Sequence, residues 1–280
     1  MMEPAGPRPN VLIVGGFMTI PPNYWPLRRR LLKRGAARVD IARLWPPDWA
    51  IAGVLGFGPI LRRTGKAIAR TYIEAGRQPI IVVAHSGGGI AARLAMSHEP
   101  FHGRIAAVSE AVGCLVTLGT PHGLADLANR YRHAGHEATS FLDRVTPGAW
   151  FAPRTSYLTV GSSYRQAALP GLAGRVAGEV FSMVVGSDTG DPAGDGIVPS
   201  AAVHLPGAEQ LTYEDARHGH LGSNWYGAQR MVDRWWPLAL RLWEEALAAR
   251  ERGVGPIGPR DEDAARQLDP GLLTGSGPRP

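Results

Sequence analysis

Short apolar runs alternate with longer amphipathic stretches along this chain. The runs are rich in β-branched residues and too uniformly apolar to leave one face in water, and they lie at 11–14, 80–84, 113–119 and 157–161. Between them, stretches such as 24–37 and 62–75 carry apolar residues three and four positions apart, which is the spacing of one helix face. This alternation predicts an α/β fold with a mostly parallel central sheet flanked by helices.

Weaker patterns fill the rest of the chain. We expect further strands at 38–44, 180–186 and 209–215, the last of them more polar, as an edge strand can be. A long helix over 224–252 is expected to bury its tryptophans against the sheet, and 45–59 is expected to be a loop rich in aromatic residues. Residues 124–153 mix apolar and polar positions without a strand pattern, which indicates a partly helical, lid-like insertion.

A serine follows the apolar run at 80–84 almost directly. Ser86 has the small residues Ala84 and Gly88 two positions before and after it, and a segment of helical spacing follows. Small flanks let a strand and a helix pass closely, so we expect a sharp turn with positive φ at this serine. Such a turn pushes the hydroxyl clear of the backbone, which makes Ser86 the candidate nucleophile. The alternative is a glycine-rich loop that binds a phosphate or merely turns, but a phosphate loop needs neither the serine nor this spacing.

Two backbone segments near this turn are candidates for holding an oxyanion. The N–H of Gly87 begins the helix after the serine, where the helix dipole favours negative charge. Gly15 and Gly16 follow the first apolar run, and a glycine pair at the carboxyl end of a parallel strand lets the backbone approach a ligand. We therefore expect the N–H groups of Phe17 and Gly87 to form an oxyanion hole.

One aspartate is placed to orient a histidine. Asp195 lies between Gly194 and Gly196, and small flanks permit a tight loop that presents a carboxylate to an imidazole ring. An ordinary surface turn is the alternative, since Asp-Gly is a common turn pair. Asp188 and Asp191 are close by and could serve the same role, or bind a cation with Asp195, but the spacing matches no calcium loop. Asp195 is the preferred acid, and no metal site is expected.

Two histidines follow the last expected strand. His218 and His220 lie two positions apart, and either suits a general base. They also look like half of a metal site, but no partner with zinc-ligand spacing accompanies them. His122 follows an earlier strand, where a loop histidine is more often structural. Serine, acid and histidine in the order Ser86, Asp195 and then His218 or His220 is the arrangement of the α/β-hydrolase fold.

Composition and charge narrow the function classes. With 44% hydrophobic residues among 280, the chain can bury a large core, and no apolar run reaches the length of a membrane span. The single cysteine, Cys114, lies in an apolar run and excludes an intrachain disulfide. The net charge is +6, and its densest basic cluster, at 28–34, alternates with leucines at helical spacing. A solvated helix face explains this cluster, so no nucleic-acid partner is expected.

The expected organisation is one domain of the α/β-hydrolase fold over 10–252. A Pro/Gly-rich arm at 1–9 precedes it and a Gly/Pro-rich tail at 253–280 follows it. Both segments lack periodicity, so the arm is expected to be flexible and the tail disordered. The compartment and the oligomeric state are left open.

Taken together, the motifs resemble α/β-hydrolases of the lipase and esterase kind, particularly bacterial and plastid lipase-like proteins, from Val11 to about Leu247. The motifs are Val-Gly-Gly-Phe, Ala-His-Ser-Gly-Gly, Leu-Gly-Thr-Pro-His, Gly-Asp-Gly-Ile-Val-Pro, and a final histidine before Trp-Tyr-Gly. Two positions depart from the family pattern. Ala84 replaces the first glycine of the usual elbow, and Gly15 stands where many lipases carry a histidine before the oxyanion glycine.

The resemblance bears on the choice of histidine. In such lipases the base follows the last strand after a short turn, which implies His218. The stretch Gly219-His220-Leu221-Gly222 instead resembles the Gly-His-x-Gly of small bacterial lipases, which implies His220. The register from the last strand favours His218.

The motifs and their resemblance predict a serine hydrolase that cleaves carboxylic esters through an acyl-enzyme intermediate, without a cofactor. Ser86, Asp195 and His218 are expected to form its triad. The apolar residues of 45–60 and of the lid-like insertion favour a small-molecule or lipid ester with a hydrophobic acyl or aryl group. The alternatives are a thioesterase, peptidase or acyltransferase of the same fold, or a non-catalytic receptor, which would normally have lost a triad member.

Overall fold

The computed structural model describes residues 8–123, 130–164, 193–220 and 222–255. In this part of the chain, parallel strands form one sheet in the order β2-β1-β3-β4-β5-β6. The strands are β1 (Asn10–Val14), β2 (Arg38–Ile41), β3 (Ile80–His85), β4 (Val112–Leu118), β5 (Ser156–Ser162) and β6 (Glu209–Tyr213). The prediction of a mostly parallel central sheet is confirmed. The strand expected at 180–186 lies outside the described residues.

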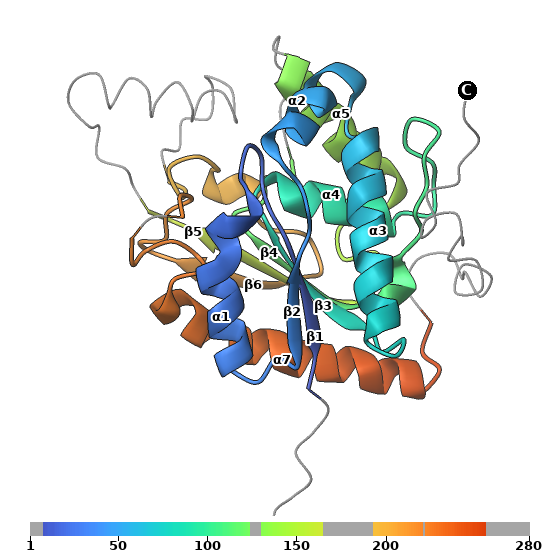
Figure 1. Ribbon diagram of the computed structural model, residues 1–280, viewed down its shortest axis with the longest axis vertical. Coiled ribbons are helices and arrows are strands. Elements are labelled where there is room, and N and C mark those ends of the chain that lie inside the picture. The colour runs from blue at the N-terminus through green and yellow to red at the C-terminus, as the bar shows by residue number, and fades with distance from the viewer. Residues whose placement is uncertain (1–7, 124–129, 165–192, 221, 256–280) are drawn as a thin grey trace, which may run out of the picture.

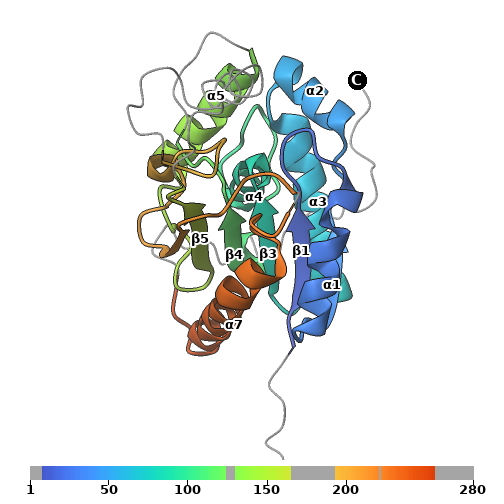
Figure 2. The same ribbon diagram turned by 90° about the vertical axis from the view of Figure 1, so that its left-hand side faces the viewer.

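Helices cover both faces of the sheet. They are α1 (Trp25–Lys33), α2 (Pro46–Leu55), α3 (Gly58–Glu74), α4 (Gly87–Met96), α5 (Arg130–Val145) and α7 (Gln229–Glu251). Short 3-10 turns add η1 (Pro21–Tyr24), η2 (Ser109–Ala111) and η3 (Ser200–Ala202). Helices α1 and α7 pack together on one face and α3 and α4 on the other, while α2 and α5 lie beyond the carboxyl ends of the strands (Figure 1 and Figure 2). The result is a three-layer arrangement of helix, sheet and helix.

The core consists of two apolar layers separated by the sheet. Within β1, Val11 and Ile13 face the layer of α1 and α7, whereas Leu12 and Val14 face the layer of α3 and α4. Successive side chains of a strand point to opposite faces, so a strand buried on both sides must be apolar at every position. In the edge strand β6, the final residue is buried and most of the others are exposed, which fits the more polar sequence of this strand.

The elements differ most from those expected at 45–59 and at the start of the final helix, while β2, β6 and α3 differ by a few residues at their ends. The stretch expected to be a loop at 45–59 contains helix α2, because Pro46 and Pro47 occupy the first helical positions, where no backbone N–H is needed. The Asp48 carboxylate also accepts the Trp45 N–H at 2.9 Å and so caps the first turn. The final helix begins at Gln229, five residues later than expected, because the preceding residues form turns beside the candidate site.

The lid-like insertion is helical where it is described. Residues 124–129 lie outside the described part, and α5 follows them directly. Phe141 and Leu142 of α5 are buried in the layer of α3 and α4, and the Phe141 ring packs edge-on against Phe101 with centroids 5.1 Å apart. This part of the insertion therefore belongs to the core. Movement of a lid stays a prediction.

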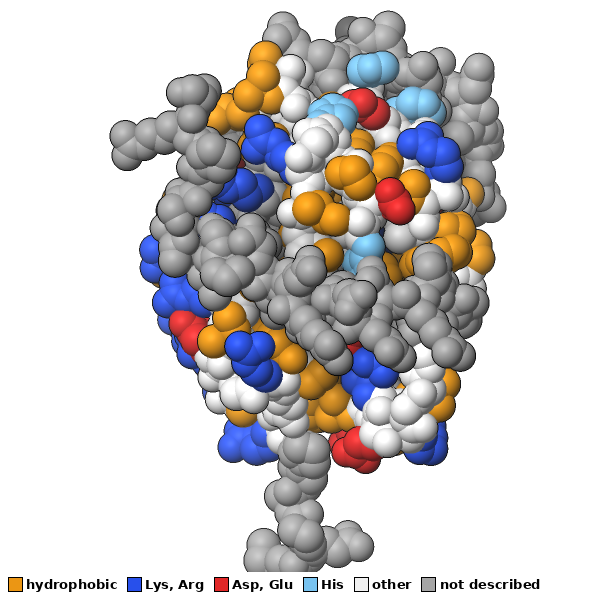
Figure 3. Space-filling view, turned by 90° about the vertical axis from the view of Figure 1, so that its right-hand side faces the viewer, with side chains coloured by type: hydrophobic (Ala, Val, Ile, Leu, Met, Phe, Trp, Pro, Cys, Tyr) orange, Lys and Arg blue, Asp and Glu red, His pale blue; other side chains and the backbone are white. Residues whose placement is uncertain are grey.

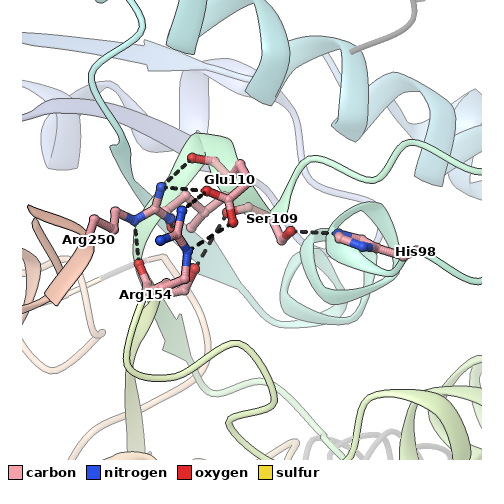
Figure 4. A network of polar contacts seen from close by, with 7 residues as sticks. His98, Ser109, Glu110, Arg154 and Arg250 are labelled. Atoms are coloured by element: carbon pink, nitrogen blue, oxygen red, sulfur yellow. Dashed lines mark hydrogen bonds and ion pairs between the residues drawn. The ribbon is translucent and has the colours of Figure 1, made fainter. Parts of the chain in front are cut away.

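A network of charged groups fixes the carboxyl end of α7 to the sheet (Figure 4). The partly buried Arg250 guanidinium donates to the backbone carbonyls of Arg154 (2.6 Å), Glu110 (2.8 Å) and Val112 (3.0 Å). The Glu110 carboxylate accepts from Arg154 at 2.7 Å and from Arg250 at 3.2 Å. Burial raises the pKa of Glu110, but the two guanidinium groups outweigh it and hold the pKa below its usual value.

The arginines of α1 serve the packing of the helix as well as its solvated face. Arg29 and Lys33 are exposed, whereas Arg30 donates to the Gly227 carbonyl at 2.7 Å and Arg34 pairs with Asp233 of α7. Among the side chains described on the face in Figure 3, lysines and arginines lie scattered between hydrophobic and uncharged groups. Within the described ranges, the helices are all too short or too polar to cross a membrane.

Candidate active site

The turn between β3 and α4 has the geometry that its sequence predicts. Ser86 connects the two elements with φ +54° and ψ −134°. Gly88 lies so close to β1 that a Cβ atom there would be 2.5 Å from the Val14 carbonyl oxygen, and Ala84 is fully buried. Small residues at these two positions therefore let strand and helix approach, and the hydroxyl of Ser86 projects beyond the carboxyl end of the sheet.

Three side chains that are far apart in the sequence meet at this turn. The Nε2 atom of His218 lies 2.9 Å from Ser86 Oγ, and its Nδ1 atom lies 2.8 Å from Asp195 Oδ2. A carboxylate only accepts hydrogen bonds, so Nδ1 carries the proton and Nε2 is the acceptor for the serine hydroxyl. Asp195 and His218 are both buried. The arrangement can draw the proton from Ser86 toward His218 while the carboxylate holds the ring.

The Asp195 carboxylate is held by four donors. One oxygen accepts the backbone N–H groups of Ile197 (3.0 Å) and Val198 (2.8 Å), and the other accepts Tyr226 Oη (2.8 Å) and the His218 ring. Burial and the neighbouring carboxylate keep the pKa of Tyr226 far above its ordinary value, so this hydroxyl remains a donor. Sequence reasoning did not assign Tyr226 a role; its only signal was its place in the Trp-Tyr-Gly stretch after the histidines.

In the described part of the chain, the contacts of His220 are with other aromatic and histidine rings and not with Ser86. Its ring lies 4.8 Å from those of Tyr24 and His85 and 5.0 Å from that of Trp225, measured between centroids. Burial, with a smaller effect of His218, lowers the pKa of His220 to about 4. His85 is also buried with a pKa well below the usual value, mainly through desolvation, and its ring lies 4.7 Å from that of His218. Both rings are therefore neutral at neutral pH.

The two backbone segments expected to hold an oxyanion lie beside Ser86. A Cβ atom on Gly16 would be 2.5 Å from Ser86 Cβ, and one on Gly87 would be 3.8 Å from the Phe17 nitrogen. The Gly16 N–H itself donates to Tyr24 Oη at 2.9 Å. The Phe17 and Gly87 backbones thus flank the serine, and their role as donors stays a prediction.

Other candidate residues lie elsewhere or outside the description. His122 is buried, with Nε2 3.1 Å from Thr117 Oγ1 and Nδ1 3.5 Å from the Arg93 guanidinium, and burial holds its pKa well below the usual value. This supports the structural interpretation of His122. Asp188 and Asp191 are not among the described residues. The described side chains include no cluster of histidine, cysteine and acidic groups suited to a metal ion.

Comparisons with known proteins agree with this architecture. Residues 61–142 match the PGAP1-like alpha/beta domain. The fold is similar to that of the Bacillus licheniformis lipase BlEst2 in its mature form, with 18% identity, a TM-score of 0.57, and 86% of this chain and 94% of the lipase covered. It is also similar to lipase 1 from Pelosinus fermentans, with 11% identity, a TM-score of 0.53, and coverage of 85% and 98%. No curated protein matches the sequence.

Proposed function

The chain has the α/β-hydrolase fold, and from this premise we propose that it is a serine hydrolase that cleaves carboxylic esters with hydrophobic acyl or aryl groups. The observation that carries the proposal is the hydrogen-bonded series from Ser86 through His218 to Asp195 at a turn with positive φ. A serine hydroxyl is a weak nucleophile unless a base takes its proton, and this series supplies the base and the group that orients it.

The proposed reaction has two steps. His218 takes the hydroxyl proton as Ser86 Oγ bonds to the ester carbonyl carbon, and the N–H groups of Phe17 and Gly87 bind the resulting oxyanion. The C–O bond then breaks, and the alcohol leaves with the proton from His218. In the second step, a water molecule gives a proton to His218 and attacks the acyl carbon. The carboxylic acid leaves as Ser86 regains its proton.

Apolar side chains around the serine support a hydrophobic substrate. Phe17, whose N–H is one of the two proposed oxyanion donors, is 48% exposed, and its ring packs edge-on against Trp49 of α2 with centroids 5.9 Å apart. The Trp49 ring in turn lies against Gly87, where a Cβ atom would be 3.3 Å from it. Further along α2, Ile51 and Val54 expose apolar side chains. An acyl or aryl group that covers such surface gains about 25 cal/mol per Å² of apolar area.

A panel of substrates tests the proposal. We expect hydrolysis of p-nitrophenyl esters at rates well above those of matched thioesters and peptides, and an increase in kcat/KM as the acyl chain lengthens from acetyl. Ser86→Ala is expected to lose about 10³-fold or more of this activity because the nucleophile is gone. Ser97→Ala, at the other end of α4, is the matched control and should stay active.

The alternatives give different results on the same panel. A preference for thioesters or peptides would identify a thioesterase or peptidase, and product transfer to an added alcohol in preference to water would identify an acyltransferase. A clean, folded protein without Ser86-dependent turnover of any substrate would indicate a non-catalytic member of the fold.

A further inference from the structure

The hydroxyl groups of Thr19 and Tyr24 hold the two peptide units around Gly16, one of which carries a proposed oxyanion donor. The Phe17 N–H belongs to the same peptide unit as the Gly16 carbonyl. Thr19 donates to this carbonyl twice, from Oγ1 at 2.7 Å and from its backbone N–H at 3.3 Å. A peptide unit is planar and trans, with N–H and C=O pointing in opposite directions. Fixing the Gly16 oxygen therefore fixes the direction of the Phe17 N–H.

The preceding peptide unit is fixed by Tyr24. Its hydroxyl oxygen accepts the Gly16 N–H at 2.9 Å, and the hydroxyl donates to Thr19 Oγ1 at 3.2 Å. The Tyr24 ring is buried and packs at a right angle against His220 with centroids 4.8 Å apart, so it cannot turn freely. Both peptide units around Gly16 are thus held by side chains of the same short segment.

The hydrogen bonds form one directed chain. Tyr24 Oη lies 2.9 Å from His85 Nδ1. The Tyr24 hydroxyl donates to Thr19 and the Thr19 hydroxyl to the Gly16 carbonyl, and the Nδ1–H tautomer of His85 completes the chain by donating to Tyr24 Oη. Hydrogen bonds in such a chain polarise one another. A polarised Gly16 carbonyl makes the N–H of the same peptide unit a stronger donor, which is what an oxyanion site requires.

Gly15 supplies the space for this arrangement. A Cβ atom at this position would lie 2.7 Å from the Tyr24 ring and 2.9 Å from Thr19 Oγ1. The space that a side chain at position 15 would need is therefore filled by the Tyr24 ring and the Thr19 hydroxyl.

We infer that Thr19 and Tyr24 are positioning residues that orient and strengthen the Phe17 N–H as an oxyanion donor. The inference rests on the proposed serine hydrolase activity. Neither side chain takes part in bond breaking. Thr19 acts through the carbonyl of the Gly16–Phe17 peptide, and Tyr24 acts through Thr19 and the Gly16 N–H. Loss of either hydroxyl should therefore weaken binding of the transition state and leave binding of the substrate nearly unchanged.

Substitution of Thr19 tests the inference. Thr19→Val keeps the shape of the side chain and removes the hydroxyl, and we expect kcat on the best p-nitrophenyl ester to fall about 10- to 100-fold with KM within about twofold. The inhibition constant of a trifluoromethyl ketone with the same acyl group should rise by the same factor, because its adduct carries the oxyanion. Thr19→Ser, which restores the hydroxyl, should return kcat to within about threefold of the wild type.

A second threonine provides the matched control. Thr155 Oγ1 donates to the Val112 carbonyl at 2.7 Å, the same length as the Thr19 bond, but at the opposite end of the sheet. Thr155→Val should lower the melting temperature and leave kcat unchanged. A folded Thr19→Val variant with kcat within twofold of the wild type, or with a loss only in KM, would overturn the inference.

Two further outcomes are informative. If Thr19→Val loses its near-UV circular dichroism, Tyr24→Phe is measured by the same criteria, since its ring stays packed and only the hydroxyl is lost. If the wild-type protein shows no Ser86-dependent hydrolysis, the proposed function and this inference both fail, and that result is visible before any Thr19 variant is made.

Discussion

Tyr226 is the residue that links the proposed triad to the start of the final helix. Its hydroxyl donates to Asp195 at 2.8 Å, and its backbone carbonyl accepts the Trp235 side chain at 2.9 Å. The hydroxyl is one of four donors to the Asp195 carboxylate, so its loss should make the position of the carboxylate less well fixed without displacing it from His218. Tyr226→Phe is expected to lower kcat/KM about tenfold, whereas Asp195→Asn should cost about 10⁴-fold, as when the orienting acid of a triad is replaced.

The comparison of these two variants is made by steady-state kinetics on one ester. Equal activity of Tyr226→Phe and the wild type would show that the remaining donors, including the N–H groups of Ile197 and Val198, hold Asp195 without the Tyr226 hydroxyl. A loss in Tyr226→Phe as large as that in Asp195→Asn would show that the carboxylate has moved.

Single residues also show which parts of the site can be read from sequence. Ser86 and Asp195 stand out because each is a potential catalytic side chain flanked by small residues, and the two histidines stand out because they follow the last strand as a general base would. Thr19, Tyr24 and Tyr226 do not stand out, because a threonine or tyrosine in a loop has many ordinary roles. Their significance lies in hydrogen bonds that span from 3 to 61 positions in the sequence and form only in the folded chain.

At the scale of elements, helix α7 is anchored at its carboxyl end by Arg250. The guanidinium donates to backbone carbonyls at and just before the start of β4 and before β5, and it shares the Glu110 carboxylate with Arg154. Arg250→Met keeps much of the side-chain volume but removes this donor from the Arg154 and Glu110 carbonyls, while the Val112 carbonyl keeps its bond from Thr155 Oγ1. We expect the free energy of unfolding to fall by about 2 to 4 kcal/mol, measured by urea denaturation.

Arg241→Met is the matched control on the same helix. Arg241 forms a surface pair with Glu245 one turn away, and such pairs contribute about 0.5 kcal/mol or less. If the two arginine variants lose equal stability, the network in Figure 4 does not anchor the helix.

The elements themselves were predictable to different degrees. Strands that are buried on both faces have continuous apolar runs rich in β-branched residues. This pattern predicted β1, β3, β4 and β5 close to their observed positions. Helix α2 was mistaken for a loop because two prolines and a tryptophan obscure the helical spacing, although prolines are favourable at the first helical positions. The late start of α7 follows from the turns that bring Tyr226 to Asp195, which no local pattern reveals.

At the scale of the whole molecule, buried neutral histidines make stability depend on pH. Burial lowers the pKa of His220 to about 4 and those of His85 and His122 well below 6.5. Between about pH 6.5 and 5, the unfolded chain binds protons at these positions and the folded chain does not. Stability therefore rises with pH in this window and is lost as the pH falls through it, by up to about 1.4 kcal/mol per pH unit for each imidazole.

His220→Phe isolates one of these contributions. Phenylalanine keeps a ring against Tyr24 and removes the titrating group, so the slope of unfolding free energy against pH should become shallower by about 1 kcal/mol per unit between pH 6.5 and 5. Urea titrations at intervals of half a pH unit measure it. An unchanged slope would mean that His220 is protonated in the folded protein.

In the proposed mechanism, Ser86 is the nucleophile and His218 activates it. This mechanism is tested most directly by peptide mass spectrometry after reaction with an alkyl fluorophosphonate. We expect one covalent adduct, on Ser86, whose rate of formation falls about 10³-fold in His218→Ala and far less in His220→Ala. An adduct on another residue, no adduct on the folded protein, or a loss of labelling in His220→Ala with His218→Ala still reactive would contradict it.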